Sequence, residues 1–142
     1  MIELIEIVET IHKGIKIIYN WYKSKKIITN KSGNPIFVLE IGRQIHKDVK
    51  KHLGEPYAIF SYSGNISSDK FHEICVIAYK KIEEILSSIE KELIIVLSGP
   101  IVMMFILGQL IGFTKTNFKI AYWKGSTYEI INPATREMLS WK

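Results

Sequence analysis

The sequence holds a single cysteine, Cys75, among its 142 residues. One cysteine excludes both a disulfide framework within the chain and a zinc site built from cysteines. Cys75 lies in the apolar-periodic stretch HEICVIAYKKI, where a free thiol usually packs as a small buried hydrophobic group. At this length the chain is expected to form one domain with an apolar core of its own.

Motifs that mark common cofactor and metal sites are absent as well. No G-x-G-x-x-G follows a candidate strand and no Walker loop occurs, so NAD binding and a Walker-type phosphate site have no support. The four histidines form no H-E-x-x-H pair, and His46 and His52 would point to different faces of a helix. Ser98 stands in L-S-G-P rather than in the G-x-S-x-G turn of hydrolases. We therefore expect no cofactor, no metal ion and no serine-hydrolase chemistry.

Arginine is scarce, because Arg43 and Arg136 are the only arginines among the 19 basic residues. The formal net charge of +5 favours anionic partners such as nucleotides, nucleic acid or lipid headgroups. It is equally typical of a protein kept soluble by surface lysines. We expect no stable complex with duplex nucleic acid.

No segment of the sequence has the pattern of a membrane span or of a secretory signal. Residues 1–11 hold three glutamates and no early basic cluster, so we expect a cytoplasmic protein. The longest uncharged run, residues 93–114, is interrupted by Ser98-Gly99-Pro100. The helical part that follows, residues 101–113, falls well short of the ~20 residues of a membrane span. A buried core helix is the favoured interpretation, and membrane contact is not expected.

An amphipathic helix is predicted over residues 2–26, followed by a turn or linker at residues 29–35. Its apolar positions recur every three or four residues: Leu4, Val8, Ile11, Ile15, Ile18 and Tyr22. The pattern divides the chain into an N-terminal helix in residues 1–28 and a core domain in residues 35–142. We favour packing of the helix on the core or oligomerisation through it. A position on a membrane surface is the alternative.

Strands and helices alternate regularly in the core domain. This order predicts an α/β fold, a Rossmann-like three-layer sandwich whose mostly parallel sheet ends in an antiparallel C-terminal β-hairpin. The predicted strands cover residues 36–41, 57–62, 93–97, 118–123 and 127–131, and the predicted helices cover residues 43–53, 70–91 and 101–113.

Ligands of open parallel sheets bind beyond the carboxyl ends of the strands. Three such ends carry glycines, serines, an arginine and an asparagine, which suit a phosphate or nucleotide crevice. Loops of this kind also hold glycine and serine simply because they turn. Aromatic residues beside the crevice could stack on a base, with Trp123 and Tyr62 as the best candidates. The candidate ligand-binding residues are Gly42, Arg43, Gln44, Ser61, Tyr62, Ser63, Gly64, Asn65, Ser98, Gly99, Pro100, Ile101, Trp123 and Lys124.

In architecture, residues 35–133 resemble the nucleotide-sensing SAVED and CARF domains of prokaryotic antiviral systems, type III CRISPR and CBASS, and the specific residues of this resemblance lie within residues 92–133. In the SAVED pattern a strand ends in a small-residue-Gly-Pro turn, here Ser98-Gly99-Pro100, and the next helix holds a glycine at its middle, here Gly108. A strand and an aromatic hairpin follow, with Tyr122 and Tyr128 in the matching places. Most such sensors are fused to an effector, and no effector sequence is present in these 142 residues.

The resemblance implies binding of a cyclic oligoadenylate, cyclic tetra-adenylate above all, across the interface of a homo-oligomer. The chain would act as a sensor or a sponge in antiviral signalling. Arg43 would pair with one phosphate, and the N–H groups after Gly99 would hold another. A ring nuclease is the enzymatic alternative, a metal-independent cleavage with Arg43, Ser61 or His46 as candidate residues. A module that interacts through the N-terminal helix is the third possibility.

Overall fold

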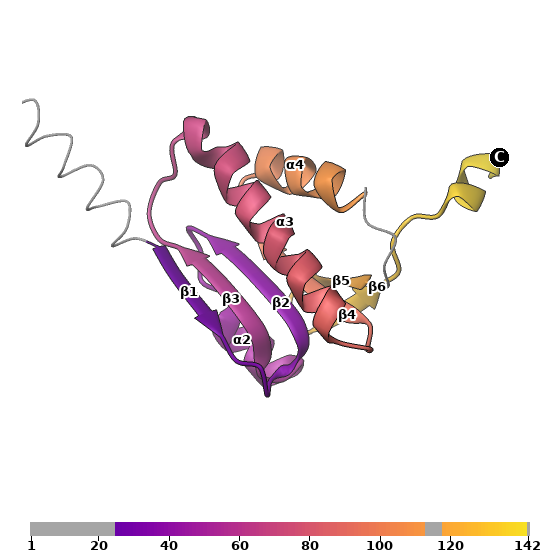
Figure 1. Cartoon of the computed structure of the whole chain (residues 1–142), viewed down its shortest axis with the longest axis horizontal. Helices are drawn as coiled ribbons and strands as arrows, with labels where there is room; N and C mark the ends of the chain where they lie inside the picture. The colour runs from indigo at the N-terminus through magenta and orange to yellow at the C-terminus, as the bar shows by residue number, and fades with distance from the viewer. Residues whose placement is uncertain (1–24, 113–117, 142) are drawn as a thin grey trace, which may run out of the picture.

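The computed structural model describes residues 25–112 and 118–141 (Figure 1). Within these residues the chain forms a mixed α/β fold with one six-stranded sheet and three α-helices. In chain order the elements are β1 (Lys25–Thr29), β2 (Asn34–Ile41), α2 (His46–His52), β3 (Pro56–Tyr62), a 3₁₀ turn η1 (Ser68–Lys70), α3 (Phe71–Ser88), β4 (Leu93–Ser98), α4 (Ile101–Ile111), β5 (Phe118–Trp123), β6 (Tyr128–Ile131) and a 3₁₀ turn η2 (Arg136–Ser140).

The sheet has the strand order β1-β3-β2-β4-β5-β6. Strands β3, β2, β4 and β5 run parallel, whereas β1 and β6 pair antiparallel at the two edges. The α/β class and the antiparallel C-terminal hairpin are confirmed. The sheet is mixed, because β1 adds an antiparallel strand at the edge opposite the hairpin, which the prediction did not include.

Strand β1 is the element that the sequence reasoning missed. Lys25 and Lys26 were expected at the end of a helix, yet they begin a strand whose five residues pair with β3 from Lys25–Tyr62 to Thr29–Ala58. The β-branched residues of K-K-I-I-T suit an edge strand, and lysines at an edge discourage pairing with other chains. The sheet therefore begins before the start predicted for the core domain. Residues 2–24 of the predicted N-terminal helix lie outside the described residues.

The helices lie on both faces of the sheet and create two separate apolar cores. The chain moves from β2 to β3 toward one edge and then from β3 through β4 to β5 toward the other. Since such crossovers are right-handed, the helices of the two directions are expected on opposite faces. Helix α2 accordingly packs with the smaller core, which includes Val49, Val38 and Val96. Helices α3 and α4 cover the larger core on the other face (Figure 1).

Helix positions agree with the sequence prediction apart from their ends. Helix α2 begins three residues after the predicted start, and α3 ends at Ser88 rather than at residue 91. Cys75 is fully buried in the larger core, and its Sγ lies 3.3 Å from the carbonyl oxygen of Met103 on α4. This confirms its predicted structural role. In the described part of the chain no helix combines the length and apolar character that a membrane crossing needs.

Candidate functional site

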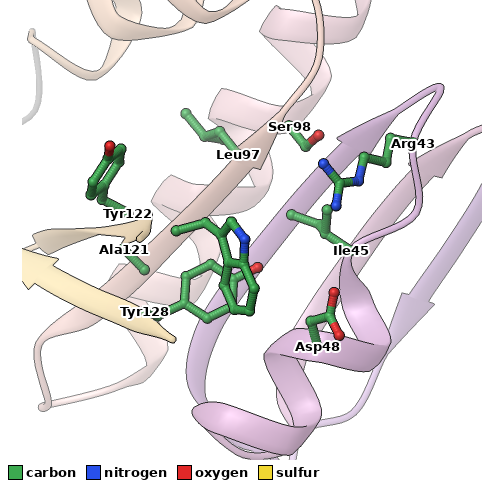
Figure 2. A pocket seen from close by; sticks show the side chains of 9 residues that line it. Arg43, Ile45, Asp48, Leu97, Ser98, Ala121, Tyr122 and Tyr128 are labelled. Carbon is green, nitrogen blue, oxygen red and sulfur yellow. The ribbon is translucent and has the colours of Figure 1, made fainter. Parts of the chain in front are cut away.

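A hollow of about 230 Å³ opens at the carboxyl ends of β2, β4 and β5, beside the first turn of α2 (Figure 2). It lies at the point where the chain leaves β2 toward one edge of the sheet and β4 toward the other, which is where parallel sheets bind ligands. Its walls are formed by Arg43, Ile45, Asp48, Leu97, Ser98, Ala121, Tyr122, Trp123 and Tyr128.

Three of the predicted site residues line this hollow: Arg43, Ser98 and Trp123. They come from the ends of three different strands, β2, β4 and β5, which the fold brings together. The other predicted residues lie at the carboxyl ends of the same strands or of β3 without lining the hollow: Gly42, Gln44, Ser61, Tyr62, Ser63, Gly64, Asn65, Gly99, Pro100, Ile101 and Lys124.

Two of these residues are unsuited to the ligand roles expected of them. Tyr62 was a candidate for base stacking, but it is 1% exposed and belongs to the larger core. Ser61 is buried as well, and its hydroxyl hydrogen-bonds to the carboxylate of Glu40. Because side chains alternate along a strand, Ser61 and Tyr62 face opposite cores rather than the loop beyond β3.

The glycines of these loops bring the strand ends close together. Gly42 has a φ of 82°, a left-handed conformation that glycine adopts at little cost, and its N–H donates to the carbonyl oxygen of Tyr62 at 2.8 Å. A Cβ on Gly99 would lie 3.1 Å from the Cβ of Ile41, so the turn after β4 packs closely on the end of β2. Both glycines therefore have structural roles here.

A buried carboxylate, Glu40, holds the loop that carries Arg43. Its Oε2 accepts hydrogen bonds from the N–H groups of Ile45 at 2.7 Å and His46 at 2.9 Å. Its Oε1 lies 2.6 Å from Nδ1 of His46. Burial raises the pKa of Glu40, but the hydrogen bonds from Ile45, Ser61 and His46 outweigh burial, so that the net pKa is lowered. Glu40 thus stays ionised and anchors the start of α2.

The sequence contained a signal for Glu40 that the prediction did not use. A charged residue in the otherwise apolar strand I-F-V-L-E-I needs partners when the strand is buried on both faces. Its distance to the backbone N–H groups of α2 depends on how the loop folds back, which only the structure shows. Glu40 therefore positions residues of the hollow without lining it.

An aromatic cluster forms the wall opposite Arg43. Trp123 and Tyr128 stand directly across from each other in the β5–β6 pair, and their ring centroids are 5.0 Å apart in an edge-to-face arrangement. His52 at the end of α2 contacts the same cluster, with its ring 5.5 Å from that of Trp123. Tyr128 was not among the predicted ligand residues. The pairing of the hairpin puts it beside Trp123.

The hollow carries one charge of each sign. Arg43 is exposed at the rim and Asp48 is half-buried on α2, and within the described residues the two form no ion pair with each other (Figure 2). Both act on Tyr128: burial raises the pKa of its hydroxyl, Asp48 raises it further, and Arg43 lowers it. A ligand with an anionic group and a hydrogen-bond donor would complement this pair of charges.

Among residues 25–112 and 118–141 no cluster of three or more histidine, cysteine or acidic side chains could hold a metal ion. Neither a protein-family model nor a curated protein matches this chain. The chemistry of the hollow is therefore argued from its own residues.

Proposed function

We propose that this chain binds a cyclic oligoadenylate, cyclic tetra-adenylate above all, and acts as a sensor or sponge in antiviral signalling. The observation that carries the proposal is the hollow at the carboxyl ends of β2 and β4, where the chain turns toward opposite edges of the sheet. Arg43 and Ser98 line one side of it, and Trp123 and Tyr128 line the other. The resemblance of the C-terminal third to SAVED and CARF domains names the ligand. We also propose that the four parallel strands with their helices form a Rossmann-like unit.

Each part of a nucleotide has a partner in the hollow. The Arg43 guanidinium can pair with a phosphate through two parallel hydrogen bonds, and the Ser98 hydroxyl can donate to another phosphate oxygen. The half-exposed ring of Trp123 offers a surface for base stacking. Asp48 can accept a hydrogen bond from an exocyclic amino group, which adenine carries and uracil lacks.

The size of the hollow suits one nucleotide rather than a whole ring. Its volume of about 230 Å³ is smaller than the 300–1,000 Å³ typical of complete small-molecule pockets. A cyclic oligonucleotide would therefore extend out of the hollow. Binding across the interface of a homo-oligomer follows, since a second copy would supply an equal hollow for another nucleotide of the ring.

Equilibrium binding of labelled cyclic tetra-adenylate tests the proposal. Arg43→Ala should weaken binding roughly 10-fold or more, because hydrogen bonds to charged groups contribute ~1.5–3 kcal/mol. Lys47→Ala is the matched control: it removes an exposed cation of the neighbouring helix that does not line the hollow. Equal affinities of the two variants would remove Arg43 from the site. No binding at micromolar protein would refute the proposed function.

A ring nuclease on the same scaffold is the alternative, and the Glu40–His46 contact favours it. The ionised carboxylate of Glu40 accepts a hydrogen bond from the Nδ1–H group of His46. This leaves Nε2 of the ring available for proton transfer. In such a reaction a ribose 2′-oxygen attacks the adjacent phosphorus and the P–O5′ bond breaks, while one proton leaves the 2′-hydroxyl and one joins O5′. His46 does not line the hollow, which is why binding is the first proposal. Linear product in the binding assay would establish cleavage.

A further inference from the structure

Helix α4 is apolar on every side, although only one side packs on the sheet. Met103 and Leu107 are fully buried, whereas Ile101 is 86% and Phe105 is 70% exposed. A helix that is apolar all round is normally surrounded by protein. The outward side of α4 therefore lacks a cover within the described residues of one copy.

A groove runs beside this uncovered side, between α4 and strand β5. Its volume is about 320 Å³ and its lining is apolar, including Leu97, Met104, Phe118 and Ile120. Gly108 contributes no side chain to it, and a Cβ built there would meet no atom within 4 Å. The groove lies on the α3/α4 face of the sheet, and among the lining residues it shares only Leu97 with the hollow described above.

The C-terminal segment carries large apolar side chains that none of the residues described in the structure covers. Leu139 is 87% exposed and Trp141 is 73% exposed. At the start of turn η2 the N–H of Met138 donates to the carbonyl oxygen of Thr135 at 3.2 Å, and the N–H of Thr135 lies 3.4 Å from Sδ of Met138. In Figure 1 this segment extends away from the sheet and helices. The residues at its root, Pro133 and Ala134, form part of the groove wall.

We propose that a second copy of the chain covers the groove, and that Leu139 and Trp141 of each copy dock into the groove of the other. The groove and the anchor side chains, Leu139 and Trp141, belong to one surface, because Pro133 and Ala134 connect them. A surface that is complementary to itself closes into a symmetric dimer. The groove lining and the anchors are uncharged, so two copies meet without like-charge repulsion.

The exposed apolar side chains are sufficient for a dimer of ordinary size. An aromatic side chain buries about 150–250 Å². Trp141 and Phe105 together with Leu139, Ile101 and the partly exposed Ile120 of β5 would approach the ~800 Å² that each partner buries in a stable interface. The inference does not depend on the proposed ligand, because the dimer is expected to form without it.

Light scattering and sedimentation of the full chain without ligand test the proposal. The expected mass is twice that of the 16.4-kDa chain. The double variant Leu139→Ser with Trp141→Ser changes only exposed side chains, so it should fold normally. It should weaken self-association by ~30-fold or more, as loss of a buried aromatic anchor does. Glu137→Ala in the same turn is the control and should leave the dimer intact.

A second variant tests the groove without endangering the fold. Gly108→Leu fills the groove and raises the helix propensity of α4, so the protein should become monomeric with an unchanged or higher Tm. Gln109→Leu places the same leucine side chain at the next, exposed position outside the groove lining and should remain dimeric. A monomeric parent chain, or a dimer that survives either the tail variant or Gly108→Leu, would overturn the proposal.

Discussion

Replacing Glu40 by glutamine should destabilise the fold by more than any exposed acidic substitution. The carboxylate is 1% exposed and accepts hydrogen bonds from two backbone N–H groups, from the His46 ring and from the Ser61 hydroxyl. Glutamine can keep the two backbone bonds through its oxygen, but its amide turns NH₂ toward the remaining donors. Loss of two charge-assisted bonds at ~1.5 kcal/mol each predicts a cost of about 3 kcal/mol.

Urea unfolding followed by circular dichroism measures this cost as a change in the free energy of unfolding. Glu55→Gln is the matched control, because Glu55 pairs with Lys50 at 3.5 Å on the surface and is 49% exposed. An exposed pair of this kind contributes less than about 1 kcal/mol. If both substitutions cost the same, the carboxylate does not hold the start of α2 and the reasoning about the Arg43 loop fails.

The same substitution should change the pH dependence of stability. The folded pKa of Glu40 is below the ordinary value of 4.5, so the folded state favours the ionised form. Its contribution is fully present above the unfolded pKa and is lost as the pH falls through the lowered folded value. The parent chain should therefore lose its advantage over Glu40→Gln below about pH 4.5. An advantage that stays constant down to pH 2 would contradict this assignment.

Burial raises the pKa of Tyr62 to about 12, so stability should fall as the pH rises from 10 to 12, and Tyr62→Phe should flatten that fall in alkaline unfolding curves. An equal slope in both proteins would show that another group titrates. Cys75, which is 0% exposed, should react with a thiol reagent only at the rate of global unfolding, and fast labelling of the native protein would place it outside the core.

Most of the secondary structure could be predicted because the local patterns are strong. Strands β2 to β6 and helices α2 to α4 appear in the predicted order with small shifts at their ends. Strand β1 was missed because Lys25-Lys26 continues a helical pattern and also suits an edge strand. Its pairing with β3 decides the matter, and that partner lies more than 25 residues further along the chain.

The candidate site could be predicted only in part. Arg43, Ser98 and Trp123 were found because strand ends with turn residues are visible in the sequence. Asp48 and Tyr128 were missed because their places depend on the turn of α2 over the sheet and on the register of the hairpin. Tyr62 was predicted to stack on a base but is buried in the larger core. The sequence at the end of a strand does not show whether an aromatic residue faces the core or the loop.

The sequence by itself determined strands β2 to β6, helices α2 to α4, the burial of Cys75 and the strand ends at which the hollow lies. These follow from periodicity, from turn residues and from the rule that parallel strands end together. The tertiary structure alone decided the antiparallel edge strand β1, the partners of Glu40, the position of Arg43 opposite Trp123 and Tyr128, and the open groove beside α4. Each of these depends on contacts between segments far apart in the chain, which local patterns do not encode.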